Sequence, residues 1–329
     1  RKENARGMAI AYSNRGNAYR QKGDLDRSIS DHTQAIAIDP TYASAYSNRG
    51  NAYHQKGDTD RAISDHTQAI AVDPTYANAY YNRANVYLGK GNFDRAIADY
   101  SQALNVDPKH SNAYHNRANA YQRKGDFDRA IADYTQAISI DVKFASAYNN
   151  RGYTYWKKGE LDRAIADYTH AISFDPKITS PYANRGRAYL FVGQAEKAAA
   201  DLSRANELDP TDGYSALWLE IASRRSGQAS KLAEATRKVD MTEWPAPVIQ
   251  FYLGQLTAEA LSAAAVHSDP ATSRRRRCEA NLYRGELALL QGDRSKAIQL
   301  LRQAAAECAR TFVASDLAIA ELRALGETP

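Results

Sequence analysis

A single asparagine recurs at a fixed interval through the first two thirds of the chain. It occupies every 34th position, at Asn14, Asn48, Asn82, Asn116, Asn150 and Asn184. A glycine keeps this interval from Gly23 to Gly193, and a proline from Pro40 to Pro210, with Val142 as the one exception. In a repeat array each unit packs mainly on its neighbours and not around one central core. We therefore expect six consecutive units within residues 1–210.

Each unit is predicted to be a pair of antiparallel helices. In the first unit, Tyr12 and Tyr19 are spaced to lie on one face of a helix. Gly23 is expected to end that helix, because glycine readily takes the left-handed backbone conformation. Asp24 then caps the second helix, and Pro40 ends it. Both flanks of such a pair are apolar and need a neighbouring pair to cover them, so the fold should be all-α.

This recurring pattern of aromatic, glycine and proline positions resembles the tetratricopeptide repeat. The resemblance covers the first 210 residues and implies a right-handed solenoid of helix hairpins. One position departs from the family pattern, because Arg15 stands where most such units have an apolar residue. Arg15 lies eight residues before Gly23 and Asp31 lies eight after it, so the two should face each other across the hairpin. We interpret this recurring Arg/Asp pair as a partly buried ion pair that specifies packing, rather than as an anion-binding row.

The asparagines lie on the opposite face from the tyrosines, and stacking should join them into a continuous polar floor. The floor comprises the six asparagines of the strict interval together with Asn17, Asn51, Asn85 and Asn119. An asparagine amide offers both donors and acceptors, which match the backbone of an extended peptide whatever its side chains. The column is similar to the asparagine ladder of the O-GlcNAc transferase superhelix, which implies sequence-tolerant peptide binding. The alternative, that each asparagine bonds to a neighbouring helix and fixes the stacking, stays open.

The side chains beside this floor change along the array. The early units contribute Ser13, Ser47, Arg20 and His54, and the later ones Tyr81, His115, Tyr153, Trp156, Arg187 and Phe191. Exposed aromatic residues are typical anchors for a bound partner, although Phe191 is equally well explained as shielding one end. The basic residues on this face, Arg20, Arg123, Lys157 and Arg187, do not recur in one column. We therefore expect no clamp for acidic C-terminal tails.

Residues 211–329 lose the strict interval and are predicted to form divergent helical hairpins, one further repeat-like pair around Gly292, and a closing helix from Phe312 to Leu325. The run Arg274–Arg277 is interpreted as a solvated loop, with an acidic partner site as the lesser alternative. Several short segments are similar to the C-terminal half of NlpI-type lipoproteins: 217–219, 244–245, 251–254, 282–286, 292–293 and 312–313.

The second resemblance covers roughly residues 200–326 and implies a dimeric adaptor at the outer membrane. Such adaptors face the periplasm and bring a processing protease together with cell-wall hydrolases. The present chain begins at Arg1, without an initiating Met or a lipid-accepting cysteine, so a removed leader and an upstream lipid anchor both stay open.

The two cysteines bear on the compartment. Cys278 lies fourteen residues before Gly292 and Cys308 sixteen after it, so an antiparallel pair would bring them to the same end. We predict a disulfide, which fits an oxidising compartment such as the periplasm. The alternative is a pair of buried thiols in a cytoplasmic protein.

The remaining sequence excludes several classes of function. The net charge is +5, and acidic and basic residues alternate, which argues against a nucleic-acid partner. No run of eighteen apolar residues occurs, so no membrane span is expected. We find no hydrolase, phosphate-loop or metal motif, and His32 and His66 share the column of Tyr100, so they should be packing residues. We therefore expect no catalytic residue, cofactor or metal.

Two functions remain. The first is a non-catalytic scaffold or adaptor that binds an extended protein or peptide segment in its concave groove. The alternative is an architectural module, either self-assembling or the repeat arm of a larger enzyme.

Overall fold

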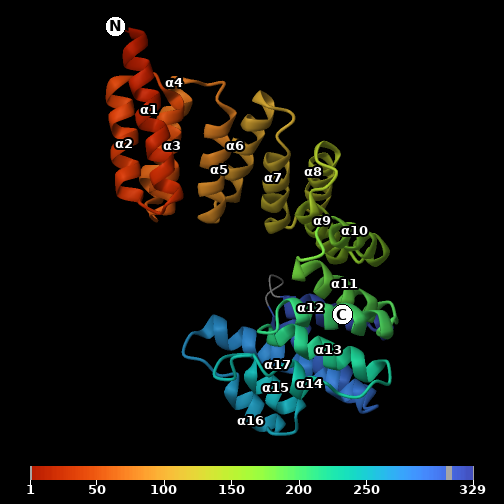
Figure 1. The fold of residues 1–329 in the computed structure, drawn as a ribbon. Coiled ribbons are helices and arrows are strands. Elements are labelled where there is room, and N and C mark those ends of the chain that lie inside the picture. The colour runs from red at the N-terminus through yellow and green to blue at the C-terminus, as the bar shows by residue number, and fades with distance from the viewer. Residues whose placement is uncertain (1, 309–312, 329) are drawn as a thin grey trace. The chain divides into compact units, whose positions relative to one another are not determined.

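The structure is a computed structural model that describes residues 2–308 and 313–328, and Phe312 of the expected closing helix lies outside these ranges. Within the described residues all regular secondary structure is α-helical, and consecutive helices pack as hairpins (Figure 1). The all-α expectation is therefore confirmed.

The first twelve helices form six pairs: α1 (Lys2–Gln21) with α2 (Leu25–Ile38), α3 (Ala43–Gln55) with α4 (Thr59–Val72), α5 (Ala77–Gly89) with α6 (Phe93–Val106), α7 (Ser111–Arg123) with α8 (Phe127–Ile140), α9 (Ala145–Lys157) with α10 (Leu161–Phe174), and α11 (Thr179–Phe191) with α12 (Ala195–Leu208). Within the described residues after position 208, seven further helices follow: α13 (Gly213–Arg225), α14 (Leu232–Ala235), α15 (Ala246–Tyr252), α16 (Ala258–Ala264), α17 (Pro270–Leu290), α18 (Arg294–Glu307) and α19 (Val313–Ala324).

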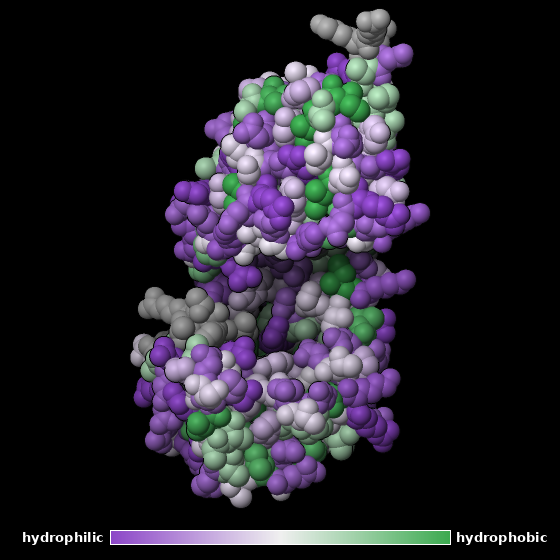
Figure 2. Space-filling model, turned by 90° about the vertical axis from the view of Figure 1, so that its left-hand side faces the viewer, coloured by the Kyte–Doolittle hydropathy of each residue, from purple (hydrophilic) through white to green (hydrophobic). Residues whose placement is uncertain are grey.

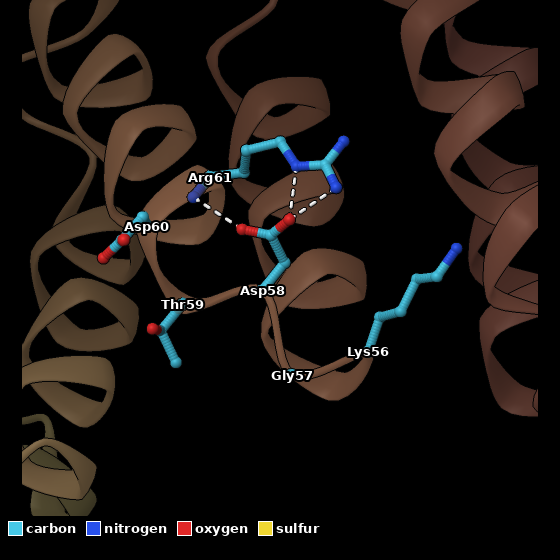
Figure 3. Close-up of a pocket in the computed structure, with 6 residues that line it drawn as sticks. All are labelled: Lys56, Gly57, Asp58, Thr59, Asp60 and Arg61. Atoms are coloured by element: carbon cyan, nitrogen blue, oxygen red, sulfur yellow. Dashed lines mark hydrogen bonds and ion pairs between the residues drawn. The ribbon is translucent and has the colours of Figure 1, made fainter.

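The turn inside each hairpin follows from two local signals. Gly57 has a φ of 89°, a left-handed conformation that suits glycine. The next residue, Asp58, accepts a hydrogen bond from the backbone N–H of Arg61 at 3.1 Å and so caps α4. Figure 3 shows this turn, with the Arg61 guanidinium folded back onto the same carboxylate and the Lys56 side chain pointing away from it. The hollow lined by these residues is the surface of the turn itself.

The predicted arginine–aspartate pairs are present in all six repeats. In the second repeat, Arg49 Nε and Nη2 both donate to the Asp65 carboxylate at 2.8 Å, and Asp65 is 6% exposed. The equivalent pairs are Arg15–Asp31, Arg83–Asp99, Arg117–Asp133, Arg151–Asp167 and Arg185–Asp201. Arg49 Nη1 also donates to the hydroxyl of Thr33 in the preceding repeat at 3.1 Å. One guanidinium therefore joins both helices of its own hairpin and the hairpin before it.

The chain divides into two compact units, residues 1–150 and 151–329, with the border inside α9. The border predicted at residue 210 marks the end of the strict interval and lies inside the second unit. In the first unit, apolar packing forms small clusters that follow the repeats, such as the one around Tyr100. In the second unit, one large cluster runs from Leu190 to Leu322 and surrounds Trp218, which is 2% exposed. The second unit therefore combines two repeats with a core of the globular type.

The interpretation of Arg274–Arg277 as a loop is wrong. These four residues lie within the first three turns of α17, which runs without a break from Pro270 to Leu290. The Asp269 carboxylate accepts from the backbone N–H of Thr272 at 2.8 Å, and Pro270 occupies the first helical position, where it is well tolerated. A capped start therefore continues directly into the repeat-like helix.

Candidate functional site

The asparagine column of the first unit lies on the first helix of each hairpin. Asn48, Asn82, Asn116 and Asn150 are each partly buried, whereas Asn14 on α1 is exposed. In every partly buried case the amide Nδ2 bonds to a side chain of the preceding repeat. Asn48 bonds to Ser13 at 3.5 Å, and Asn82 bonds to Ser47 at 3.2 Å. The asparagines therefore connect adjacent repeats.

The third and fourth repeats are connected by more hydrogen bonds, because a second asparagine takes part. Asn116 Nδ2 donates to the Tyr81 hydroxyl at 3.1 Å and to Asn85 Oδ1 at 2.9 Å. Asn85 Oδ1 also accepts from the hydroxyl of Tyr100 at 2.6 Å. Burial raises the pKa of Tyr100, so this hydroxyl remains a donor at neutral pH.

The same arrangement recurs one repeat later. Asn150 Nδ2 donates to Asn119 Oδ1 at 3.0 Å and lies 3.1 Å from His115 Nε2, while the Tyr134 hydroxyl donates to Asn119 at 2.6 Å. Because His115 Nε2 accepts here, its ring proton sits on Nδ1, which lies 3.2 Å from Asn116 Oδ1. Burial lowers the pKa of His115 and keeps the imidazole neutral.

The first two repeats use a smaller version of this network. His32 and His66 replace the tyrosine, and their Nδ1 atoms lie 3.3 Å and 3.4 Å from the hydroxyls of Ser13 and Ser47. Both imidazoles are fully buried, and desolvation lowers their pKa values to about 4 and about 3. They are packing residues, as expected. In this version Asn51 is partly buried, and Asn17 Oδ1 is buried without a hydrogen-bond partner among the described residues.

The aromatic residues predicted beside the floor are partly used in packing. The Tyr81 ring lies 4.6 Å from the ring of His110, and the His115 ring lies 4.9 Å from that of Phe144, measured between centroids. Each contact joins a first helix to the residues that precede the next one. Tyr81 and His115 are each only partly buried.

In the second unit, four of the predicted site residues come together. Tyr153, Trp156, Asn184 and Arg187 line one small pocket with the buried Tyr168. The Tyr153 and Trp156 rings stack at 5.7 Å, and Arg187 Nη2 donates to Asn184 Oδ1 at 2.5 Å. The pocket is completed by Leu317 of α19, which no sequence signal had connected with this face. Phe191 is 9% exposed and belongs to the large apolar cluster of the second unit.

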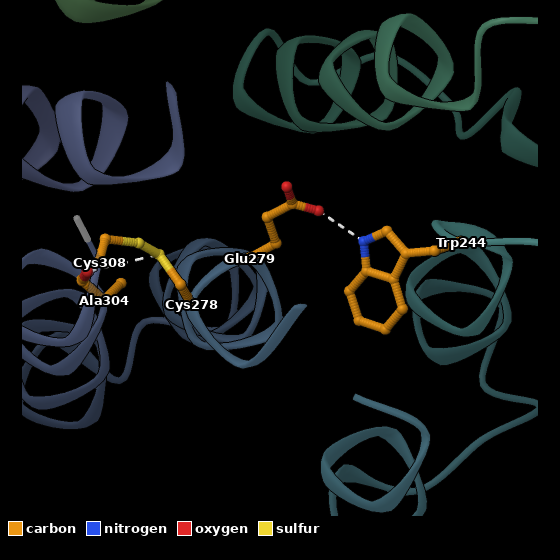
Figure 4. Close-up of a disulfide and its surroundings, with 5 residues drawn as sticks. All are labelled: Trp244, Cys278, Glu279, Ala304 and Cys308. Carbon is orange, nitrogen blue, oxygen red and sulfur yellow. Dashed lines mark hydrogen bonds between the residues drawn. A yellow bond between two sulfur atoms is a disulfide. The ribbon is translucent and has the colours of Figure 1, made fainter. Parts of the chain in front are cut away.

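Cys278 and Cys308 form a disulfide in the structure, and their Cα atoms are 5.7 Å apart. The bridge joins α17 to the end of α18, as the spacing around Gly292 predicted. Figure 4 shows the bridge and the neighbouring Glu279, whose carboxylate accepts from the Trp244 indole N–H at 2.5 Å. The same carboxylate accepts from the Tyr214 hydroxyl at 2.8 Å. Burial raises the pKa of Glu279, and the two donors oppose that shift.

One face of the molecule is mainly polar. Figure 2 shows a face on which hydrophilic residues predominate and hydrophobic ones occur singly or in small groups. Within residues 2–308 and 313–328, no cluster of three or more metal-ligating side chains occurs. Over the same ranges, none of the helices has the length and apolar character needed to cross a membrane.

Comparisons with known proteins agree with this architecture. Family models described as TPR repeat match residues 16–57 and 50–91, and models described as tetratricopeptide repeat match residues 75–141, 115–177 and 179–212. Together the matched segments span more than half of the chain.

Three of the solved structures that resemble this chain differ in how much of it they match. A tetratricopeptide repeat protein from Parabacteroides merdae is 16% identical, with a TM-score of 0.52, and the match covers 96% of this chain and 99% of that one. PilF of Pseudomonas aeruginosa is 17% identical, with a TM-score of 0.57, over 64% of this chain and 95% of that one. MamA is 28% identical over 49% of this chain and 95% of its own, with a TM-score of 0.46. The repeats, their turns and the matched models lead to one conclusion: the chain belongs to the tetratricopeptide repeat family.

Proposed function

We propose that this protein is a non-catalytic scaffold that binds an extended segment of a partner protein along the asparagine-bearing face of its repeats. The observation that carries the proposal is that Asn48, Asn82, Asn116 and Asn150 each bond to the preceding repeat and are yet only partly buried. An amide has two N–H donors and an oxygen with two lone pairs, and the bond from Asn82 to Ser47 uses one of these groups.

Such fixed amides are suited to binding a peptide backbone. A free surface asparagine loses rotamer freedom when a ligand binds, and ordering one side chain costs about 0.5–1.5 kcal/mol. In this protein the preceding repeat has already ordered the side chains. Packing and binding are therefore compatible roles, because the bond between repeats orients the amide for a partner.

The test uses a partner segment captured by the immobilised protein from a periplasmic extract and then shortened to a peptide. We expect Asn82→Ala/Asn116→Ala to weaken binding at least tenfold, with little dependence on salt, because neutral amides are not screened. Asn105→Ala is the matched control, since Asn105 is an exposed asparagine on the second helix of a hairpin. Unchanged affinity in the double variant, with a steep loss in salt for both proteins, would assign the binding to charge.

A second variant separates binding from packing. Tyr81→Phe removes the hydroxyl that accepts from Asn116 but leaves the asparagine amide in place. We expect this variant to lose stability and to keep most of its affinity. Equal losses of affinity in Tyr81→Phe and Asn116→Ala would indicate that the asparagines act only through stacking.

We also propose that the scaffold works in the periplasm, where it recruits proteases or cell-wall hydrolases, as a dimer associated with the outer membrane. The support is the similarity of residues 200–326 to NlpI-type adaptors together with the Cys278–Cys308 bridge. Alkylation of free thiols in intact cells, followed by mass spectrometry, tests the compartment. Two alkylated cysteines would place the protein in the cytoplasm.

The outer face of α1 supports a second candidate, a self-assembling module. The Arg15 side chain is 58% exposed, whereas Arg49 and Arg83 are each 18% exposed, because a preceding repeat covers them. Ala11 and Ala18 are likewise exposed, although their counterparts Ala45 and Ala52 are fully buried. Light scattering over a range of concentrations tests this candidate: assembly that Arg15→Glu abolishes would support it.

A further inference from the structure

Helix α19 does not simply extend the array beyond α18. Lys157 Nζ at the end of α9 pairs with Asp316 Oδ2 of α19 at 2.5 Å, across 159 residues of sequence. Both side chains are about 15% exposed. The ion pair is therefore largely shielded from water, where such contacts are stronger than on an open surface. It ties α19 to the helix that carries Tyr153 and Trp156.

The next residue of α19 makes the apolar contact. Leu317 is 4% exposed and closes the pocket lined by Trp156 and Arg187. Ala318 and Leu322 are fully buried on the same side of the helix. The spacing of Ala314, Leu317, Ala318 and Leu322 is that of one apolar helix face. Trp156 and Tyr189 pack against the cluster that contains these residues.

A second charged contact fixes the far end of α19. Arg225 Nη2 of α13 lies 2.8 Å from Glu321 Oε1 of α19 and 2.6 Å from Glu286 Oε2 of α17. Glu321 is 3% exposed. The docked side of α19 thus presents an aspartate, a leucine and, five residues after the aspartate, a glutamate. Lys157 pairs with the aspartate, and Arg225 pairs with the glutamate.

The pocket that Leu317 closes is lined by residues from the columns that we assign to partner binding, among them Tyr153 and Arg187. Tyr153 and Arg187 occupy the positions that Asn85 and Asn119 have in earlier repeats, each at multiples of 34 residues. The chain therefore covers this part of the face with its own helix.

We propose that this face of repeats five and six, together with Arg225 of α13, is a binding site for an amphipathic helix of the pattern Asp-Leu-x-x-x-Glu, and that α19 is its intramolecular occupant. A partner helix with the same pattern then binds in competition with α19. The inference rests on the proposed function, since it assigns a helical partner to a part of the same face. It differs from the asparagine site in its ligand, which is a helix held by charge and leucine and not an extended backbone.

Competition within one chain sets the expected behaviour. A tethered helix acts at an effective concentration in the millimolar range, so a free peptide of similar intrinsic affinity competes poorly with it. Weakening the contacts of α19 should expose the site and raise the affinity for an added peptide. The experiment therefore uses the whole chain of residues 1–329 with a single change in α19.

The probe is a fluorescent peptide of residues 313–326, and its binding is followed by anisotropy. Asp316→Lys places a second cation beside Lys157, and the repulsion should release α19 from the site. The variant should therefore bind the wild-type peptide at least tenfold more tightly than the wild-type protein does. Asp316→Asn, which loses only the charge, should give an intermediate gain. Asp162→Lys is the control, because Asp162 is an exposed aspartate on α10.

A charge exchange makes the test specific. Lys157→Asp should bind a peptide carrying Asp316→Lys more tightly than the wild-type peptide, and Lys177→Asp, at an exposed lysine, should show no such preference. Circular dichroism and the intact disulfide establish that each variant is folded. Equal or absent peptide binding in folded Asp316→Lys, Asp316→Asn and wild-type proteins would overturn the inference and make α19 a permanent cap.

The proposed scaffold function and the proposed helix site can each be contradicted without the other. An extended partner segment that still binds through Asn82 and Asn116, with no response to Asp316→Lys, would leave the scaffold function in place and remove the helix site. Loss of extended-segment binding, with the peptide of residues 313–326 still bound by Asp316→Lys, would do the reverse.

Discussion

Asn116 and Asn85 lie in adjacent repeats, and the amide nitrogen of Asn116 donates to the amide oxygen of Asn85 at 2.9 Å. Asn85 Oδ1 simultaneously accepts from the buried hydroxyl of Tyr100, which comes from the second helix of the same hairpin. One oxygen therefore joins the two helices of a hairpin to the next hairpin. This bond explains how a polar column can hold a stack together while remaining partly open to solvent.

Replacing Asn116 should weaken that stack. Asn116→Ala removes the bonds to Tyr81 and Asn85, and each net hydrogen bond contributes about 1 kcal/mol. We expect a loss of about 1–3 kcal/mol in the free energy of unfolding, measured from urea midpoints, and faster hydrogen exchange in α5 and α7. Asn105→Ala should change neither. An identical midpoint for the two variants would contradict this role.

Gly50 is needed for close packing and not for a turn. A Cβ atom at this position would lie 2.9 Å from Cε1 of the buried His66 ring. Gly50→Ala should therefore destabilise the protein by about 1–3 kcal/mol, as overpacking does. Gly7→Ala is the control, since its Cβ would meet no atom within 4 Å, and helix propensity favours alanine by up to about 1 kcal/mol. Thermal unfolding of the two variants should shift in opposite directions.

The buried histidines should make the first unit sensitive to acid. Desolvation lowers the pKa of His66 to about 3, with His54 and Arg83 as the nearby cations that act in the same direction. The unfolded chain, with a histidine pKa near 6.5, binds more protons than the folded chain below that pH. Stability is therefore present above pH 6.5 and is lost as the pH falls from 6.5 toward 3.

His66→Tyr should remove part of this loss. Tyr168 occupies the same column opposite Gly152, at the same 2.9 Å approach, so the combination of glycine and tyrosine is already accommodated in this fold. The new hydroxyl would lie near Asn51, the counterpart of Asn85. Urea midpoints measured between pH 7 and pH 4 should fall less steeply in the variant. Equal slopes would show that other groups set the acid sensitivity.

The second unit should respond to pH in the opposite direction. Burial raises the pKa of Glu286 to about 8, and the negative charge of Glu321 acts in the same direction. The positive charge of Arg225 opposes this shift. Tyr252 is a further titratable group near Glu286. Between the unfolded pKa near 4.5 and about 8, the folded state binds more protons. Stability should therefore decrease as the pH rises through this window. Glu286→Gln should flatten the dependence, and hydrogen exchange in α17 from pH 6 to pH 8 measures it.

The bridge between Cys278 and Cys308 closes a loop with a sequence separation of 30. In the chain-entropy account, closing such a loop contributes about 3–4 kcal/mol. Cys278→Ser/Cys308→Ser should lower the urea midpoint of the second unit by a corresponding amount and leave the first unit unchanged. Titration of the denatured, unreduced wild-type protein should find no free thiol. Two free thiols would contradict the bridge.

The sequence by itself determined the features that repeat or act locally. The interval of 34 residues defines the hairpins, Gly57 and Asp58 define a turn, and Arg49 and Asp65 can be paired from their distances to that turn. These features follow from helix geometry within some forty residues, where spacing along the chain translates directly into position in space. The bridge between Cys278 and Cys308 is predictable for the same reason.

Only the tertiary structure decided which atoms the asparagines contact and what covers the later repeats. The sequence left open whether Asn116 binds a partner or a neighbouring helix, because that depends on how closely two hairpins stack. It also gave no indication that Leu317 would meet Trp156, since α19 lies outside the interval and nothing in its spacing refers to residues more than 150 positions earlier. Contacts between distant segments are selected by the apolar surface and the charges that remain after the local hairpins have formed, and those quantities exist only in the folded chain.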